Sequence, residues 1–186
     1  MNFKFNVNTN EEDYLAYNKF WLLKSPYGRK QVIGLRILIL VLWGVFALSS
    51  FFKYDFSITA WIATCIYAVC LAVCEFLLNP FLAWTVKCQI KGLKKKGKIA
   101  YSPTSEFEFY DEYFVETTPE NKTEQKYTSI ERVSIIADEV LYIHLNNLAC
   151  YIIPTSCFES KEQYCAFIDF LKTKCENIDV YNGKKK

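Results

Sequence analysis

Apolar residues are concentrated in two blocks of the chain, residues 32–52 and 57–78, whereas polar and apolar residues are mixed elsewhere. Each block is long enough to cross a hydrocarbon core of about 30 Å as a helix, which takes about 20 residues. A short polar loop separates the blocks. The pattern therefore predicts a two-helix transmembrane hairpin over residues 32–86, and it excludes an ordinary soluble domain.

The segment before the first block, residues 1–31, carries signals for one strand and one helix. Residues 3–7 alternate between apolar and polar side chains, which is typical of a strand. Thr9 and Glu12 have the spacing of a capping box, which predicts a helix from about residue 10 to residue 23. The Pro-Tyr-Gly sequence at 26–28 then breaks this helix.

After residue 98 the apolar period changes to two, which predicts short strands. The expected strands are 98–101, 106–110, 113–116, 124–127, 130–136, 140–145 and 148–153. A capping box at Ser160 begins a final helix whose apolar stripe is Tyr164, Phe167, Ile168, Leu171 and Cys175. We expect an α+β domain over residues 99–180, an antiparallel β-barrel or sandwich capped by a C-terminal helix, followed by a basic tail at 181–186.

This layout resembles the YcxB-like family of bacterial membrane proteins. The resemblance is carried by the Glu-Asp-Tyr sequence at 12–14, the membrane hairpin, the segments 127–133, 141–143 and 151–154, and the final amphipathic helix. It implies a pleckstrin-homology-like (PH-like) domain in a bacterial membrane protein. It implies no catalytic residues and no established activity.

Charge divides the 186-residue chain unevenly and sets an expected orientation. Residues 87–98 hold six lysines and no acidic residue, whereas residues 99–186 hold nine basic and fifteen acidic residues, a net charge of −6. Short Lys/Arg-rich segments beside membrane helices stay in the cytoplasm, and such segments lie before the first block and after the second. We therefore expect a two-pass protein of the cell membrane, with both termini cytoplasmic and the first block retained as an anchor.

Several residues are expected to contact the bilayer interface. The lysines of the basic juxtamembrane segment at 87–98 would contact lipid head groups, or would serve only to fix the topology. Three tryptophans are expected to anchor the interfaces, and Pro80 is expected to kink the second helix rather than end it. These residues are Lys87, Lys91, Lys94, Lys95, Lys96 and Lys98, and Trp21, Trp61 and Trp84.

Two charged residues, Arg36 and Glu75, lie inside the apolar blocks. A charge at the centre of a membrane helix costs about 2.5 to 3.5 kcal/mol on insertion scales, so each one needs an explanation. Both residues are expected at nearly the same depth, close to the cytoplasmic face, where they would form an ion pair. The alternative is that each side chain reaches interfacial water independently.

The remaining residues give little support for catalysis or for cofactor binding. The eight cysteines contain no C-x-x-C pair and His144 is the only histidine, so we expect no metal and no cofactor. The cysteines are expected to be small buried apolar residues, and His144 is expected at the surface or lining the barrel. The acidic C-terminal region disfavours nucleic acid as a partner.

We therefore expect a membrane-anchored, non-catalytic binding or adaptor protein that presents a PH-like domain to a protein partner at the cytoplasmic face of a bacterial membrane. A homo-oligomer is compatible with this function. The alternative is a subunit of a small oligomeric transporter or channel, with Arg36 and Glu75 at the pore.

Overall fold

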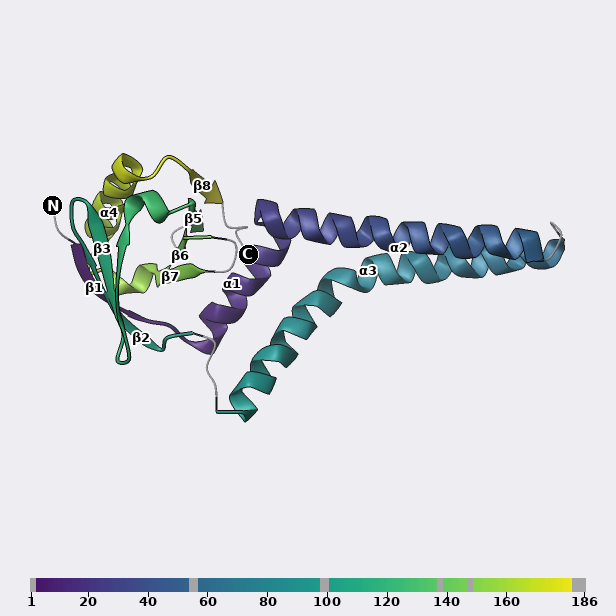
Figure 1. The fold of residues 1–186 in the computed structure, drawn as a ribbon, viewed down its shortest axis with the longest axis horizontal. Helices are drawn as coiled ribbons and strands as arrows, with labels where there is room; N and C mark the ends of the chain where they lie inside the picture. Colours follow the sequence, from purple (N-terminus) through teal and green to yellow (C-terminus); the bar gives the residue numbers. More distant parts are fainter. Residues whose placement is uncertain (1–2, 54–56, 98–100, 137–138, 147–148, 182–186) are drawn as a thin grey trace. The chain divides into compact units, whose positions relative to one another are not determined.

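The protein, as seen in a computed structural model that describes residues 3–53, 57–97, 101–136, 139–146 and 149–181, divides into two compact units (Figure 1). The helical unit comprises residues 18–98. The β unit comprises residues 1–17 together with residues 99–186. The helical unit is therefore an insertion in the sequence of the β unit.

Two long helices, α2 (Pro26–Lys53) and α3 (Ile58–Lys95), form most of the helical unit. Ring centroids lie 5.7 Å apart for Trp43 and Tyr67, and 5.2 Å apart for Phe51 and Trp61. The residue number rises along one helix while it falls along the other, so α2 and α3 form an antiparallel hairpin. The two predicted helices are confirmed, and both extend beyond the apolar blocks.

Helix α3 continues through Pro80 for four more turns, although proline removes one backbone donor from the helix. Figure 1 shows that α3 lies along α2 at first and then bends away from it. The structure therefore agrees with a proline that does not end the helix.

Helix α1 (Glu11–Leu23) is capped by Asn10 and not by Thr9. The Asn10 side-chain oxygen accepts hydrogen bonds from the backbone N–H groups of Glu12 and Asp13, at 2.8 and 2.9 Å. The Asp13 carboxylate accepts in return from the Asn10 backbone at 3.1 Å. The predicted box of Thr9 and Glu12 was therefore wrong by one residue, because Asn and Asp satisfy the same N-terminal donors that Thr and Glu would.

The junction between α1 and α2 is a tight turn at Ser25. The Ser25 hydroxyl donates to the Trp21 carbonyl and accepts from the Gly28 backbone N–H at 3.0 Å. A Cβ atom on Gly28 would lie 1.9 Å from that same carbonyl oxygen. Only glycine fits this close approach, and Pro26 suits the first turn of α2.

The first sheet of the β unit contains strands from both ends of the sequence. β1 (Phe3–Asn8), β2 (Thr104–Phe109), β3 (Tyr113–Thr117) and β4 (Lys122–Lys126) lie in this order and pair antiparallel. β1 therefore belongs to this sheet and not to a separate N-terminal element. Its register places Phe5 opposite Phe107 on the buried face, and Lys4 opposite Glu108 on the other.

The second sheet has the order β7-β6-β5-β8. Its strands are β5 (Arg132–Ile136), β6 (Val140–His144), β7 (Cys150–Pro154) and β8 (Ile178–Tyr181). Short 3-10 helices, η1 (Tyr127–Ser129) and η2 (Thr155–Cys157), precede and follow its three antiparallel strands.

One expectation about this architecture needs correction. β8 follows the last helix and pairs parallel with β5, so the helix does not close the fold and the strands are not all antiparallel. Of the two expected arrangements, the described residues show two separate sheets and no closed barrel. The expected strand 98–101 lies largely outside the described residues, as do Asn147 of the β6–β7 turn and the tail at 182–186.

One core of aromatic and aliphatic residues is shared by both sheets and by α4 (Lys161–Lys174). The Ser160 hydroxyl caps α4 by accepting from the Gln163 backbone at 3.2 Å. The predicted stripe is confirmed, because Tyr164, Phe167 and Leu171 are buried. The Phe167 ring lies 5.3 Å from that of Phe3 and 4.8 Å from that of Phe109, so α4 joins the first sheet to the core.

Candidate functional site

The helical hairpin brings Arg36, Glu75 and Asn79 together. Arg36 Nε lies 3.6 Å from Glu75 Oε2, and Arg36 Nη2 donates a 3.2 Å hydrogen bond to the Asn79 side-chain oxygen. Glu75 and Asn79 are one helical turn apart on α3, so both face the same position on α2. Asn79 was not part of the sequence-based site, although its i+4 spacing from Glu75 is a signal that could have identified it.

The polar cluster formed by Arg36, Glu75 and Asn79 lies far from the loop end of the hairpin. Arg36 is 17 residues from Lys53, and Glu75 is 17 residues from Ile58. At a rise of 1.5 Å per residue this is about 26 Å. A hydrocarbon core of about 30 Å that began at the loop would therefore contain the cluster just inside its opposite boundary.

This ion pair keeps unused hydrogen-bonding capacity. Arg36 Nε and Glu75 Oε1 are both buried without a hydrogen-bond partner in the described part of the chain. A polar atom withdrawn from water without a partner is unfavourable by about 1 to 3 kcal/mol. A further hydrogen bond to either atom would therefore stabilise the cluster.

The three tryptophans occupy different environments. Trp61 packs edge-on against Phe51 near the loop end of the hairpin. Trp84 lies beyond Pro80 with 58% of its surface exposed, and its ring is 5.9 Å from that of Phe81. Trp21 lies on α1, where its backbone carbonyl receives the Ser25 hydroxyl. Their anchoring role stays a prediction.

The predicted lipid-contacting lysines lie at the end of α3. Lys87, Lys91, Lys94 and Lys95 are exposed within the helix, and Lys96 is its C-terminal cap. Lys98 lies outside the described residues. The first four recur at i, i+4, i+7 and i+8, so they share one face of the helix.

The open face of the first sheet carries alternating charges. Lys4 Nζ lies 2.8 Å from both Glu106 and Glu108, and the Tyr110 hydroxyl donates to Glu108 at 2.8 Å. The bond from Lys4 is the main cause of a lowered pKa for Glu108. These pairs are exposed, and such pairs contribute little to stability.

A buried polar group lies on the opposite side of the second sheet from the shared core. Ser134 Oγ and His144 Nε2 are 3.3 Å apart, and the rings of Tyr17 and His144 are 6.0 Å apart. Burial, and secondarily the charge of Arg132, lowers the His144 pKa to about 4. His144 is therefore not at the surface and does not line the core, because Tyr17 of α1 packs over it. Sequence periodicity could not place α1 on this sheet face.

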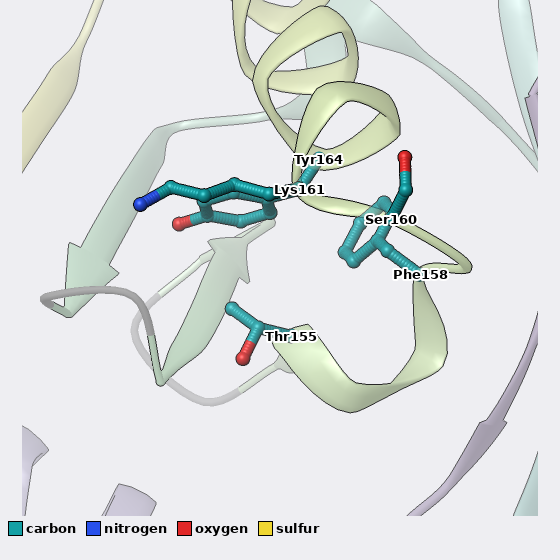
Figure 2. A pocket seen from close by; sticks show the side chains of 5 residues that line it. All are labelled: Thr155, Phe158, Ser160, Lys161 and Tyr164. Atoms are coloured by element: carbon teal, nitrogen blue, oxygen red, sulfur yellow. The ribbon is translucent and has the colours of Figure 1, made fainter.

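A pocket of about 290 Å³ opens beside the N-terminus of α4 (Figure 2). Its lining combines the aromatic rings of Phe158 and Tyr164 with the Lys161 side chain and the hydroxyl-bearing residues Thr155 and Ser160. Figure 2 shows the Lys161 amine on the same side as the Tyr164 hydroxyl, whereas the Ser160 and Thr155 oxygens point away from them. Both of these hydroxyls already have protein partners. The pocket could hold an apolar side chain of a partner beside one positive charge.

All eight cysteines are free thiols, and the described residues contain no group of three or more metal-binding side chains. Cys175 is buried, and Cys150 and Cys157 are half-buried, with pKa values raised by burial. The other five cysteines are exposed, namely Cys65, Cys70, Cys74, Cys88 and Cys165. The expectation of cysteines as small buried apolar residues is therefore wrong for these five.

A model of the YcxB-like protein family matches residues 109–171, which run from the end of β2 to most of α4. The suspected resemblance is confirmed over this segment of the β unit. No curated protein and no solved structure matches the chain.

Proposed function

We propose that this YcxB-like protein is a membrane-anchored, non-catalytic binding protein, in which the hairpin of α2 and α3 crosses a bacterial cell membrane twice. The β unit, which we propose to be PH-like, is held at the cytoplasmic face. There it binds a protein partner.

The observation that carries this proposal is the exposure of apolar side chains along the hairpin. Both helices are long and apolar enough to cross a membrane, and almost none of their most apolar residues are buried. Leu48, Val41 and Phe76 have 61%, 57% and 82% of their surface exposed. Each Å² of apolar surface left in water costs about 25 cal/mol, which a bilayer would remove. A core helix of a soluble protein would bury these side chains.

The distribution of basic residues supports the orientation. Lysines cluster at the end of α3, and Arg29 and Lys30 lie in the first turns of α2. The opposite end of the hairpin carries Lys53 alone. Because the Lys/Arg-rich side of a membrane helix stays in the cytoplasm, both termini and the β unit belong on that side.

The charge of the β unit favours a protein or peptide as the partner. The net charge of −6 over residues 99–186 repels nucleic acid and anionic lipid head groups. The pocket beside α4 offers aromatic rings and one lysine, which suits a short apolar and acidic segment of a partner.

Membrane fractionation with a C-terminal tag tests the anchor and its orientation. We expect the full chain to remain in the membrane pellet after alkaline carbonate washing. We also expect the tag to be degraded by protease only after the cells are permeabilised. A chain that is soluble without detergent, or a tag that is digested on intact cells, would contradict the proposal.

Proximity labelling from the C-terminus tests the binding role. A labelling enzyme fused after residue 186 is expected to mark a small set of membrane-proximal proteins reproducibly. The test variant is Lys161→Glu, which reverses the charge at the pocket, and the unaltered chain is its control. Lys161 is exposed on α4, so the change should not disturb the core. Loss of specific labels in this variant supports the pocket, and an identical label set assigns partner binding to another surface.

The polar cluster favours a second candidate, a subunit of an oligomeric transporter or channel. Arg36 Nε and Glu75 Oε1 retain open hydrogen-bonding capacity inside the hairpin. Two helices cannot enclose a path, so this function requires several copies. Oxidative cross-linking in native membranes through the exposed Cys65, Cys70 and Cys74 distinguishes the candidates, because a strict monomer excludes a pore.

A further inference from the structure

Along one face at the end of α3, the exposed side chains change from aromatic to basic. Phe81, Trp84, Cys88, Lys91 and Lys95 follow one another at intervals of three or four residues, so they form a single stripe. All five are exposed. The stripe therefore changes from aromatic to basic in the direction that leads away from the hairpin loop.

The lysines of this helix point away from its packed side. Ile90 retains only 7% of its surface and Val86 is half-buried, whereas Lys87 and Lys91, their neighbours in sequence, are exposed. Lys94 and Lys95 continue the same exposed face. The packed side of the helix is therefore apolar and the open side is cationic.

The lysine positions have no acidic residue within three turns on their own helix, because none occurs between Glu75 and Glu106. Aromatic residues followed by lysines are the order in which side chains meet the interface and then the head groups of a bilayer. A cluster of lysines next to a membrane helix attracts anionic lipid, and the attraction falls off within a Debye length.

We propose that the lysine face of α3, defined as Lys87, Lys91, Lys94 and Lys95, binds the phosphate groups of anionic phospholipids of the inner leaflet, while Phe81 and Trp84 lie at the interface above them. This inference rests on the proposed function, because it requires that the hairpin crosses the bilayer. It assigns to these lysines a direct contact in addition to setting the topology.

The test measures lipid selectivity in full-length protein reconstituted into phosphatidylcholine vesicles. Trace spin-labelled phosphatidylglycerol or phosphatidylcholine reports, by electron paramagnetic resonance, the fraction of each lipid that the protein immobilises. We expect a preference for phosphatidylglycerol of about fivefold at low salt, the effect of one lysine near an anionic surface. The preference should weaken at high salt.

Three variants assign the preference to the lysine face. Replacing all four lysines by glutamine should reduce the ratio to about one, whereas replacing them by arginine should retain it. The matched control replaces Lys122, Lys126, Lys172 and Lys184 of the β unit by glutamine, which removes the same charge and should leave the ratio unchanged. Circular dichroism verifies that each variant keeps its helix content.

The outcomes separate this inference from the anchor itself. Protein that is retained in the vesicles but shows no lipid preference, or a glutamine variant that keeps the preference, overturns the lysine face and leaves the anchor intact. Loss of the preference in the β-unit control overturns it too. Protein that is not retained in vesicles at all overturns both.

Discussion

The two units of this protein use phenylalanine in opposite ways. In the β unit Phe107, Phe109 and Phe167 are at most 1% exposed and contact one another in the core. In the helical unit Phe52 and Phe76 are 79% and 82% exposed. Exposed phenylalanine is unfavourable in water, so the contrast agrees with the proposed placement of the hairpin in a bilayer.

Charged groups show the reverse arrangement. Lys4, Glu106 and Glu108 lie on the open face of their sheet, where water solvates them. Arg36 and Glu75 instead face each other between α2 and α3. A hairpin surrounded by lipid must turn its charges inward, just as a sheet surrounded by water turns them outward. The predictions below test this contrast.

The largest expected effect is the loss of a core phenylalanine. Phe167→Ala should lower the free energy of unfolding by about 3 to 5 kcal/mol, because it leaves a cavity between the sheets and α4. Phe76→Ala is the matched control and should cost less than about 1 kcal/mol, because lipid chains can fill the space. Urea titration of the full chain in detergent micelles, followed by circular dichroism, measures both. Equal losses would mean that the hairpin side chain is buried in protein.

The buried histidine gives the next effect, which depends on pH. His144 has a pKa of about 4 in the folded chain against an ordinary value of 6.5, so the unfolded chain binds a proton that the folded chain does not. The contribution of neutral His144 to the free energy of unfolding is therefore fully present above pH 6.5. It is lost as the pH is lowered toward 4, and the loss is up to about 3 kcal/mol.

Unfolding measured at pH 7 and at pH 5.5 tests this dependence. His144→Gln keeps a donor for Ser134 and removes the titrating group, so its stability should change less between these two values. An unaltered pH dependence in this variant would assign it to other groups.

A smaller loss is expected from breaking the ion pair of the hairpin. Glu75→Leu leaves the Arg36 charge without its partner, which should cost about 2 kcal/mol near the membrane boundary. Arg36→Leu in addition should recover much of this loss, because no lone charge remains. Unfolding in mixed detergent and dodecyl sulfate micelles measures the double-mutant cycle, and purely additive effects would show that the two side chains act independently.

The smallest predicted effect concerns the N-terminus of α1. Asn10→Ala should destabilise the fold by about 1 kcal/mol, because two backbone donors lose their acceptor. Thr9→Ala should change stability by less than about 0.5 kcal/mol. Thermal unfolding of both variants compares them directly, and the opposite order would restore Thr9 as the cap.

Local patterns predicted the elements of this fold well, and long-range pairing accounts for most of what they missed. The strand around Phe107 and the helix around Phe167 could be predicted from the spacing of their apolar residues, because each element buries one face. The pairing of β1 with β2 could not be derived in this way, because it joins segments on either side of the hairpin. The strand β8 from Ile178 to Tyr181 was not among the expected strands, and nothing local indicated β5 as its parallel partner.

The residues of the candidate site were also predictable only where their partners lie close in the sequence. Arg36 and Glu75 could be related because the hairpin is local and each lies the same number of residues from the loop. The surroundings of His144 could not, because they depend on how α1 packs on the second sheet. A residue whose environment comes from a distant element has no local signature.

The pairing of β1 with β2 also has a consequence for the order of synthesis. Roughly 95 residues must leave the ribosome after β1 before its partner strand exists, which takes about 5 to 20 s at bacterial or slower elongation rates. The hairpin occupies most of this interval, because α3 ends at Lys95 and β2 begins at Thr104. β1 therefore has no partner strand until the chain beyond the hairpin is made, and a nascent chain that stops between the two strands would contain the hairpin without a folded β unit.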